Sequence, residues 1–262
     1  MSRTIYAFLI GIDVYPAPIP TLSGCVNDIE AFAVYLGARV NKDKAVALRI
    51  KTLKNAEATR DAVIQGFQEH FEPARTGDVA LFYYSGHGSQ EPTPEEFWSI
   101  EPDHFDETLV CYDSRSTTWD LADKELAKLI DEVAVRGPHV LAILDCCHSG
   151  SGTRDASEVV RRVSTDRRRR PIESFVLSAD QIRATATRGS FGQAGKAWNI
   201  PTTQGRHILL AACAPDQEAK EVTGDGQRRG AFSFHLSEAL RSANGIPTYR
   251  DLYARVGALV AS

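Results

Sequence analysis

The stretch Val79-Ala80-Leu81-Phe82-Tyr83-Tyr84-Ser85-Gly86-His87-Gly88 decides the fold. It begins as a continuous apolar and aromatic run, which is typical of a strand buried on both faces of a parallel sheet. It ends in a glycine-rich turn that carries a histidine. His139–Gly150 has the same build, with an apolar run followed by Asp-Cys-Cys-His-Ser-Gly. Two such strands predict a parallel sheet that presents polar side chains at one edge.

The order of the remaining elements extends this sheet. Further strands are predicted at Thr4–Asp13, Val46–Leu53 and His207–Cys213. Helical patterns fall between and after the strands, at Asn27–Leu36, Thr59–Phe71, Asp123–Ala134, Ala231–Arg241 and Thr248–Leu259. The alternation predicts an α/β fold, a doubly wound and mainly parallel sheet with helices on both faces. Functional groups in such folds follow the carboxyl ends of the strands.

Composition and charge exclude several classes of protein. The 262 residues are 43% hydrophobic and 24% charged, as in an ordinary globular protein and unlike a disordered or fibrous one. A net charge of −4 does not favour nucleic acid as the main partner. The first apolar run stops at Asp13, which is too short for a membrane span, and no cleavage site for a secretory signal follows. Five cysteines, an odd number, favour reduced thiols in the cytoplasm over a disulfide framework.

A histidine and a cysteine that follow two of the central strands predict nucleophilic catalysis. Cys147 can attack as a thiolate, and His87 within hydrogen-bond reach would supply first a base and then an acid for the leaving amine. The backbone N–H groups of Gly88 and Cys147 are candidates for holding the developing oxyanion. Each residue alone is more often structural, but the pair at two strand ends favours catalysis. A cysteine in the position of Cys146, beside the nucleophile, more often packs into the sheet, and Cys111 and Cys213 are likewise expected in the core.

These motifs resemble those of the caspase-like cysteine peptidases, and of the metacaspase branch in particular. Tyr84–Gly88 and Asp145–Gly150 are similar to the two strand ends of that family, with Cys146 in place of the usual serine. Leu22–Asp28 resembles a third motif, and Gly230-Ala231-Phe232 resembles the small-subunit region. The resemblance assigns the nucleophile to Cys147 and its base to His87.

The resemblance implies a single caspase-like domain over residues 1–262. Residues 1–150 would be large-subunit-like, residues 151–206 a flexible arginine-rich linker, and residues 207–262 small-subunit-like. The chain stops at Ser262 within a helical pattern, where this family commonly has a further strand, so a truncated C-terminus is an open expectation.

A preference for basic residues also follows from the resemblance. The family's pocket for a substrate Arg or Lys matches four residues that are all present, namely Cys25, Asp28, Ser85 and Asp145. Two acids can hold a guanidinium by charge-assisted, bidentate bonds. Without the family, Asp28 is more readily a carboxylate at a helix N-terminus, and Asp145 a turn residue. With it, we expect an endopeptidase that cleaves proteins at exposed arginine, and secondarily at lysine.

The arginines of the linker are expected to be processing sites. Arg161, Arg162 and the run Arg167, Arg168, Arg169 and Arg170 lie where caspase-like enzymes are cut on activation. An arginine-specific peptidase with such a linker is expected to be a zymogen, cut by itself or by an upstream activating protease. A solvated charge run or a nucleic-acid-binding patch is the alternative, and the latter would bind in a salt-dependent way.

No metal and no cofactor are expected. Many metacaspases need calcium, but here Lys124 replaces an expected acid, and Arg154 replaces another, with Asp155 one place late. Since a calcium ion takes six to eight oxygen ligands, these changes predict no calcium requirement. The remaining acids of this region are expected to be solvated loop residues, at Asp103, Asp106, Glu107 and Asp120.

Two other functions are open at this point. The chain could be a catalytically inactive caspase homologue that acts as an interaction scaffold. It could also be a redox-sensing thiol protein built on Cys146 and Cys147. The intact Cys–His pair and the intact acidic pocket favour the peptidase over the inactive scaffold, and the redox alternative stays open.

Overall fold

The centre of the molecule is a five-stranded parallel sheet in the order β2-β1-β3-β7-β8. The computed structural model describes residues 3–98, 101–148, 159–178, 181, 207–212, 219–224, 226–243 and 247–260. The strands of the sheet are β1 (Arg3–Gly11), β2 (Val46–Lys54), β3 (Val79–Ser85), β7 (His139–Asp145) and β8 (His207–Ala211). Each begins at or within a residue of its predicted start, because continuous apolar runs are strong signals for buried strands.

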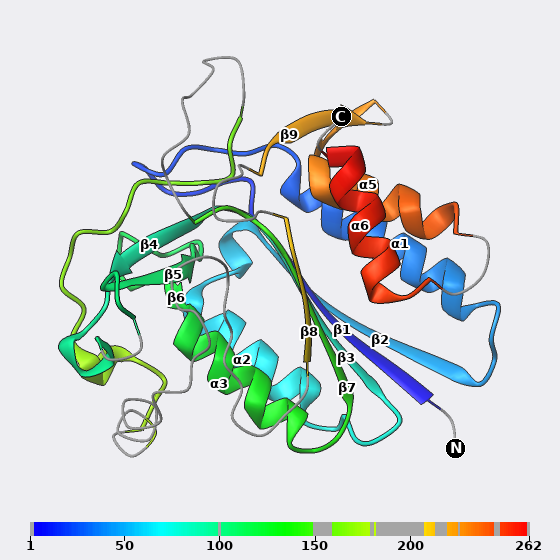
Figure 1. Ribbon diagram of the computed structural model, residues 1–262, viewed down its shortest axis with the longest axis horizontal. Coiled ribbons are helices and arrows are strands. Elements are labelled where there is room, and N and C mark those ends of the chain that lie inside the picture. Colours follow the sequence, from blue (N-terminus) through cyan, green and yellow to red (C-terminus); the bar gives the residue numbers. More distant parts are fainter. Residues whose placement is uncertain are drawn as a thin grey trace.

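Helices cover both faces of this sheet (Figure 1). One face carries α2 (Arg60–Phe71) and α3 (Asp123–Ala134), and the other carries α1 (Cys25–Val40), α5 (Ala231–Arg241) and α6 (Tyr249–Val260). The alternation of side chains along β1 separates two hydrophobic clusters, with Phe8 in the cluster of α2 and α3 and Leu9 in the cluster of α1 and α5. The predicted doubly wound α/β fold is therefore confirmed.

Several short elements were not predicted. A second sheet is antiparallel and consists of β4 (Gly88–Pro92), β5 (Phe105–Leu109) and β6 (Leu121–Ala122). A hairpin of β9 (Glu221–Gly224) and β10 (Gln227–Gly230) precedes α5. Single 3₁₀ turns are η1 (Asn55–Glu57), η2 (Glu95–Phe97) and η3 (Ile172–Ser174). These segments are too short and too polar for periodicity to reveal them.

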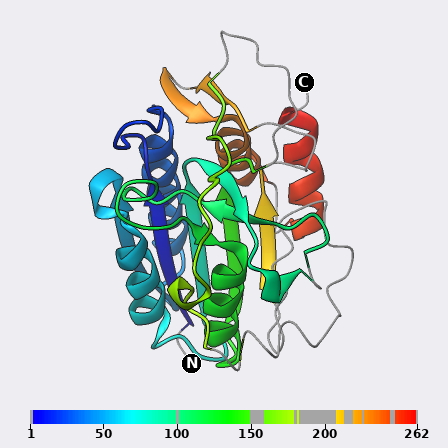
Figure 2. The same cartoon turned by 90° about the vertical axis from the view of Figure 1, so that its left-hand side faces the viewer.

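The carboxyl ends of the central strands meet at one edge of the molecule. In the register of β3 and β7, Ser85 lies opposite Asp145, and in that of β1 and β3, Gly11 lies opposite Ser85. The turns that carry His87 and Cys147 therefore open on the same side. Figure 2 shows the β9–β10 hairpin (orange) beyond this end of the sheet, with the N-terminus at the opposite end. The predicted sheet thus brings its polar strand ends together.

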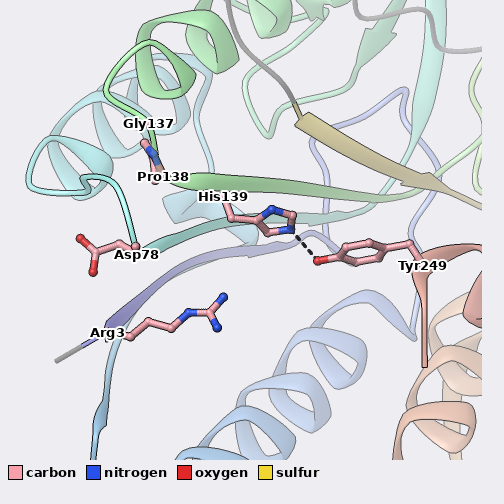
Figure 3. Close-up of a pocket in the computed structure, with 7 residues that line it drawn as sticks. Arg3, Asp78, Gly137, Pro138, His139 and Tyr249 are labelled. Carbon is pink, nitrogen blue, oxygen red and sulfur yellow. Dashed lines mark hydrogen bonds between the residues drawn. The ribbon is translucent and has the colours of Figure 1, made fainter. Parts of the chain in front are cut away.

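A hollow lies at the other end of the sheet, near the beginnings of β1, β3 and β7 (Figure 3). Arg3, Asp78, His139 and Tyr249 are among its lining residues, and His139 Nε2 lies 2.7 Å from the Tyr249 hydroxyl. It is remote from the turns that carry the predicted catalytic residues. Among the described helices, none has both the length and the apolar character needed to cross a bilayer.

Part of the predicted linker is well packed. Residues 159–178 are described and lie against the second sheet and the β9–β10 hairpin, whereas residues 151–158, 179–180 and 182–206 lie outside the described residues. The division into large-subunit-like, linker and small-subunit-like parts remains a prediction.

Candidate active site

His87 occupies the turn between β3 and β4 and is buried. Its Nε2 lies 2.9 Å from the carbonyl oxygen of Pro20, and because a carbonyl can only accept, Nε2 carries the proton. Nδ1 is then left with a lone pair, and it has no hydrogen-bond partner within the described part of the chain. Burial lowers the pKa of His87 to about 4. The imidazole is therefore neutral near pH 7, with an available basic nitrogen.

Two tyrosines fix the backbone of this histidine. The N–H of His87 donates to the Tyr15 hydroxyl at 3.0 Å, and the Tyr84 hydroxyl donates to the His87 carbonyl oxygen at 2.7 Å. Both hydroxyls approach Gly86 so closely that a Cβ there would lie 2.6 Å from one and 2.7 Å from the other. The glycine of the Ser-Gly-His-Gly motif is therefore needed for space.

The N–H groups of Gly88 and Cys147 converge on one oxygen atom. Each donates to the carbonyl oxygen of Arg161 at 3.1 Å. A Cβ on Gly88 would lie 2.2 Å from the carbonyl oxygen of Cys147, so this approach requires glycine. Two donors on one carbonyl oxygen form the arrangement that stabilises an oxyanion during acyl transfer.

The cysteines are not all reduced. The Cys147 sulfur is in a disulfide, whereas Cys25, Cys111 and Cys146 are free. The expectation that all cysteines are reduced is therefore wrong at Cys147. An odd number of cysteines does not exclude a disulfide between two of them. A cysteine attacks as the thiolate, so a nucleophile at this position would first have to be reduced. Cys213, which was expected in the core, lies outside the described residues.

Cys146 is packed in the core beside a second histidine. Its sulfur lies 3.3 Å from His148 Nε2, and His148 Nδ1 lies 3.2 Å from the carbonyl oxygen of Ser89. Nδ1 must donate to that carbonyl, so Nε2 accepts from the Cys146 thiol. Burial raises the pKa of Cys146. The thiol is therefore neutral and shielded, which disfavours a redox function at this position.

The pocket that was predicted for a substrate arginine contains the chain's own Arg161. This side chain has no exposed surface. Its guanidinium lies 2.9 Å from Asp28 and 3.1 Å from Asp145, and it donates to the hydroxyl of Ser85 at 2.7 Å. Three of the four predicted pocket residues are thus brought together around one cation.

The fourth predicted residue, Cys25, is buried beside this group. Burial raises the pKa of the Cys25 thiol, and the positive charge of Arg161 opposes that rise. Two glycines form the closest walls of the pocket, because a Cβ on Gly24 would lie 2.9 Å from the guanidinium and one on Gly230 would lie 2.4 Å from it. The pocket therefore fits a flat guanidinium closely.

The sequence did not predict the further charged and polar groups that contact Arg161, Asp28 and Asp145. Glu221 lies 3.3 Å from the Arg161 guanidinium, and Arg229 donates from Nε to Asp28 at 2.6 Å. The N–H of Ser233 donates to Asp145 at 3.1 Å. Burial raises the pKa of Asp28 to about 6, against the opposing charge of Arg161. These partners come from β9, β10 and α5, and the Gly230-Ala231-Phe232 motif was the nearest available signal.

The backbone around Arg161 is bound like an added strand. The N–H of Arg161 donates to the carbonyl oxygen of Ala219 at 2.9 Å, and the N–H of Glu221 donates to that of Val159 at 3.0 Å. Val160 and Lys220 form an antiparallel bridge between these bonds. Arg161 is thus held by its backbone N–H, its carbonyl oxygen and its side chain together.

The other predicted processing residues have different surroundings. Arg162 is half-buried, and Arg167, Arg168 and Arg169 are exposed, although the Arg168 guanidinium lies 4.4 Å from the ring centre of Trp119. Arg170 is buried between Glu91 at 2.8 Å and Glu125 at 2.9 Å. The interpretation as a solvated charge run is therefore wrong for Arg161 and Arg170, because carboxylates pair with both inside the protein.

An acidic cluster beside α3 is filled by Lys124. The ammonium lies 2.8 Å from Glu101, 2.5 Å from Asp106 and 3.4 Å from Asp123. Although burial alone would lower the pKa of Lys124, these carboxylates raise it. The lysine therefore stays charged and supplies the cation that such a cluster needs. Arg154 and Asp155, the other positions considered for calcium, lie outside the described residues.

Two of the acids expected in solvent are buried instead. Asp106 and Asp120 have no exposed surface, and the Asp120 carboxylate forms an ion pair with the Arg115 guanidinium at 2.7 Å. Glu107 is half-buried, and burial raises its pKa to about 7. Asp103 is exposed as expected. The expectation failed because Asp106 belongs to the short strand β5, which the sequence did not reveal.

Comparison with known proteins places these features in a family. The Caspase domain family matches residues 4–262. Metacaspase-1 of Coccidioides immitis is 26% identical over 256 residues, which cover 90% of this chain and 54% of that protein. Metacaspase-7 of Arabidopsis thaliana is 31% identical over 174 residues, covering 66% of this chain and 41% of that protein. This chain thus spans about half the length of these curated relatives.

A solved structure has the same fold. Protein GSU0716 from Geobacter sulfurreducens superposes with a TM-score of 0.65 at 23% identity, over 97% of this chain and 88% of that one. At this identity the likeness supports the α/β architecture alone.

The buried pairing of Arg161 predicts a pH-dependent loss of stability. In a Cys147→Ala background, Arg161→Met should lower the free energy of unfolding near pH 8 by about 3 kcal/mol, because buried carboxylates lose their cation. The loss should shrink near pH 5. Asp28 already has a raised pKa in the folded state, and protonated acids need no partner.

Urea unfolding at both pH values measures this loss of stability. Arg169→Met, at an exposed arginine, is the control, and an equal loss at both pH values would contradict the pairing.

Proposed function

The chain belongs to the caspase-domain family and is of the metacaspase type, and we propose that it is a cysteine endopeptidase that cleaves proteins after arginine, with lysine second. The observation that carries this proposal is the placement of Arg161. Its guanidinium lies between Asp28 and Asp145, while its carbonyl oxygen accepts from Gly88 and Cys147. A peptide residue held in this way is positioned as the residue before a scissile bond.

The proposed reaction is an acyl transfer through Cys147. After reduction, Nδ1 of His87 takes the proton of the Cys147 thiol, and the thiolate attacks the carbonyl carbon. The two backbone N–H groups stabilise the oxyanion. The imidazolium then gives its proton to the leaving amine, and water, deprotonated by the same nitrogen, hydrolyses the thioester. The Pro20 carbonyl orients the imidazole through Nε2, a contact that the sequence did not predict.

The shape and charge of the pocket support arginine as first choice. A planar guanidinium can face Asp28, Asp145 and Ser85 at the same time, as Arg161 does. A lysine ammonium has the right charge but no planar fork, so it would satisfy fewer of these partners. An acidic side chain would meet buried carboxylates and be repelled.

Peptide turnover tests this proposal and separates its rivals. The reduced protein should release coumarin from an Arg-coumarin peptide faster than from the Lys form, and should leave the Asp form uncut. Cys147→Ala and His87→Ala should each lower turnover by about a thousandfold or more, because the two residues act as a unit. Cys146→Ala is the matched control and should keep its activity. Preference for the Asp peptide, or full activity of Cys147→Ala, would contradict the assignment. Absence of turnover in every form would favour the inactive scaffold.

We further propose that the Arg161–Arg162 bond is the one cut on activation. Arg161 fills the pocket that a substrate needs, so the intact chain blocks itself. Among the described linker arginines, Arg161 is the one whose carbonyl oxygen lies on the Gly88 and Cys147 N–H groups. The cut is made by the protein itself or by an upstream activating protease. Protein substrates with exposed Arg or Lys are therefore the proposed partners.

Mass spectrometry of the purified protein tests this cut. After reduction, the wild-type chain should yield one fragment that ends at Arg161 and another that begins at Arg162. Cys147→Ala should stay intact, and mixing it with wild-type protein shows whether the cut also occurs between molecules. Arg161→Gln should remove this cut, whereas Arg169→Gln should leave it in place. An intact wild-type chain with full peptidase activity would rule out the zymogen.

We propose that the peptidase needs no calcium, because the acidic cluster beside α3 does not fit the ion. The Lys124 ammonium already lies within 2.5 to 3.4 Å of the carboxylates of Glu101, Asp106 and Asp123. A calcium ion in the same place would meet a positive charge and would lack oxygen ligands.

Chelation tests the independence from calcium. Turnover of the Arg-coumarin peptide should be the same in EDTA and in millimolar calcium chloride, with magnesium chloride as the control for ionic effects. The thermal unfolding midpoint should likewise not respond to calcium, because a ligand that binds the folded state would raise it. Activity that EDTA abolishes and calcium restores would overturn the proposal.

A further inference from the structure

The residues that follow Arg161 lie along the edge of β4. The N–H of Val163 donates to the carbonyl oxygen of Gly88 at 3.1 Å, and the N–H of Asp166 donates to that of Gln90 at 2.8 Å. Arg162 and Gly88 form a parallel bridge between the two segments. Backbone hydrogen bonds of this kind can bind an extended peptide of any sequence. Pockets for the peptide's side chains, beside these bonds, give specificity.

Val163 fills an apolar site beside this edge. Its side chain is 7% exposed and belongs to the hydrophobic cluster on the α2 and α3 face of the sheet. The next residue, Ser164, is exposed. The side chain at the second position after Arg161 therefore packs into the hydrophobic core of the protein. A charged side chain there would be buried without a partner.

Arg115 makes the second selective contact. Its guanidinium donates to the carbonyl oxygen of Ser164 at 2.9 Å and lies 3.5 Å from the carboxylate of Asp166, which is almost fully buried and also pairs with Arg168 at 2.7 Å. Asp120 and the Ser89 hydroxyl hold the same guanidinium at 2.7 and 2.6 Å. Arg115 also has a φ of +65°, a backbone conformation that non-glycine residues adopt at a cost. Its position is thus well fixed, and it favours an acid at the fifth position after Arg161.

We propose that the β4 edge and Arg115 form a recognition site for the residues after the scissile bond. It selects an apolar side chain at the second position and an acidic one at the fifth. The inference rests on the proposed peptidase function and names a specificity of the same site. Such a site would favour Arg161 over the other linker arginines. Of the six arginines at 161, 162 and 167–170, only Arg161 has an apolar residue two places later and an acid five places later.

The rate of self-cleavage after reduction measures this specificity. The protein is purified in the oxidised form, dithiothreitol starts the reaction, and mass spectrometry follows the fragment that begins at Arg162. Val163→Asp should slow this cut about tenfold or more, because the new carboxylate is buried without a partner. Asp166→Asn and Arg115→Gln should each slow it about threefold, as expected for loss of one partly screened ion pair. Thr165→Asp adds the same charge between these positions and is the control.

Turnover of the Arg-coumarin peptide, which has no residues after the scissile bond, separates the possible failures. This turnover, expressed per cut molecule, depends on the catalytic centre alone. The ratio of the self-cleavage rate to coumarin turnover should therefore fall in Val163→Asp, Asp166→Asn and Arg115→Gln. The coumarin turnover also shows that each variant has folded. If Val163→Asp and Asp166→Asn cut themselves as fast as Thr165→Asp, the recognition site is refuted while the peptidase stands. If the wild-type protein cuts neither itself nor the coumarin peptide, both proposals are refuted.

Discussion

The buried ion pairs of Arg161 with Asp28 and Asp145 join the start of α1 to the end of β7 and the segment after it. Asp28 comes from the first turn of α1, Asp145 from the end of β7, and Arg161 from the segment that follows. A guanidinium with no exposed surface is tolerated only where carboxylates and hydrogen-bond acceptors surround it. Its placement fixes where the Arg161 carbonyl oxygen lies, and thereby aligns the backbone donors of Gly88 and Cys147 with it.

Gly88 contacts the segment around Arg161 through both its backbone N–H and its carbonyl oxygen. Its N–H binds the carbonyl oxygen before the proposed scissile bond, and its carbonyl oxygen binds the N–H of Val163 after it. One peptide unit on each side of Gly88 therefore sets the register of the chain on both sides of the bond. The close approach of Cys147 leaves no room for a side chain at this position. A glycine is therefore needed at this position for both the proposed catalytic geometry and the proposed recognition geometry.

The sequence alone predicted the central sheet well, because five apolar or alternating runs are strong and local signals. It also predicted which strand ends would meet, and therefore that His87, Gly88 and Cys147 belong to one edge. The pocket residues Cys25, Asp28, Ser85 and Asp145 came from family resemblance, since an acid at a helix start has an equally simple structural explanation. The structure then brought them together around Arg161.

Other parts could not be predicted, for physical reasons. The Pro20 carbonyl that orients His87 is a backbone group, and any residue type could have supplied it. Arg229 meets Asp28 across more than 200 positions of sequence, in a hairpin too short to show periodicity. Asp106 seemed solvated because its strand has five residues, of which three are polar. Lys124 was identified as a substitution from the sequence, but its contacts with Glu101, Asp106 and Asp123 depend on the tertiary structure.

The sharing of Asp28 between two arginines has an electrostatic consequence. One Asp28 oxygen faces Arg229 and the other faces Arg161, so Arg229 would stay paired with Asp28 after the proposed release of the Arg161 side chain. Three carboxylates, Asp28, Asp145 and Glu221, would then outnumber the two remaining guanidiniums of Arg228 and Arg229, and the vacated cavity would be anionic. Such a cavity attracts cationic polypeptides through solvent before any contact forms, which accelerates encounter in dilute buffer and fades as ionic strength rises.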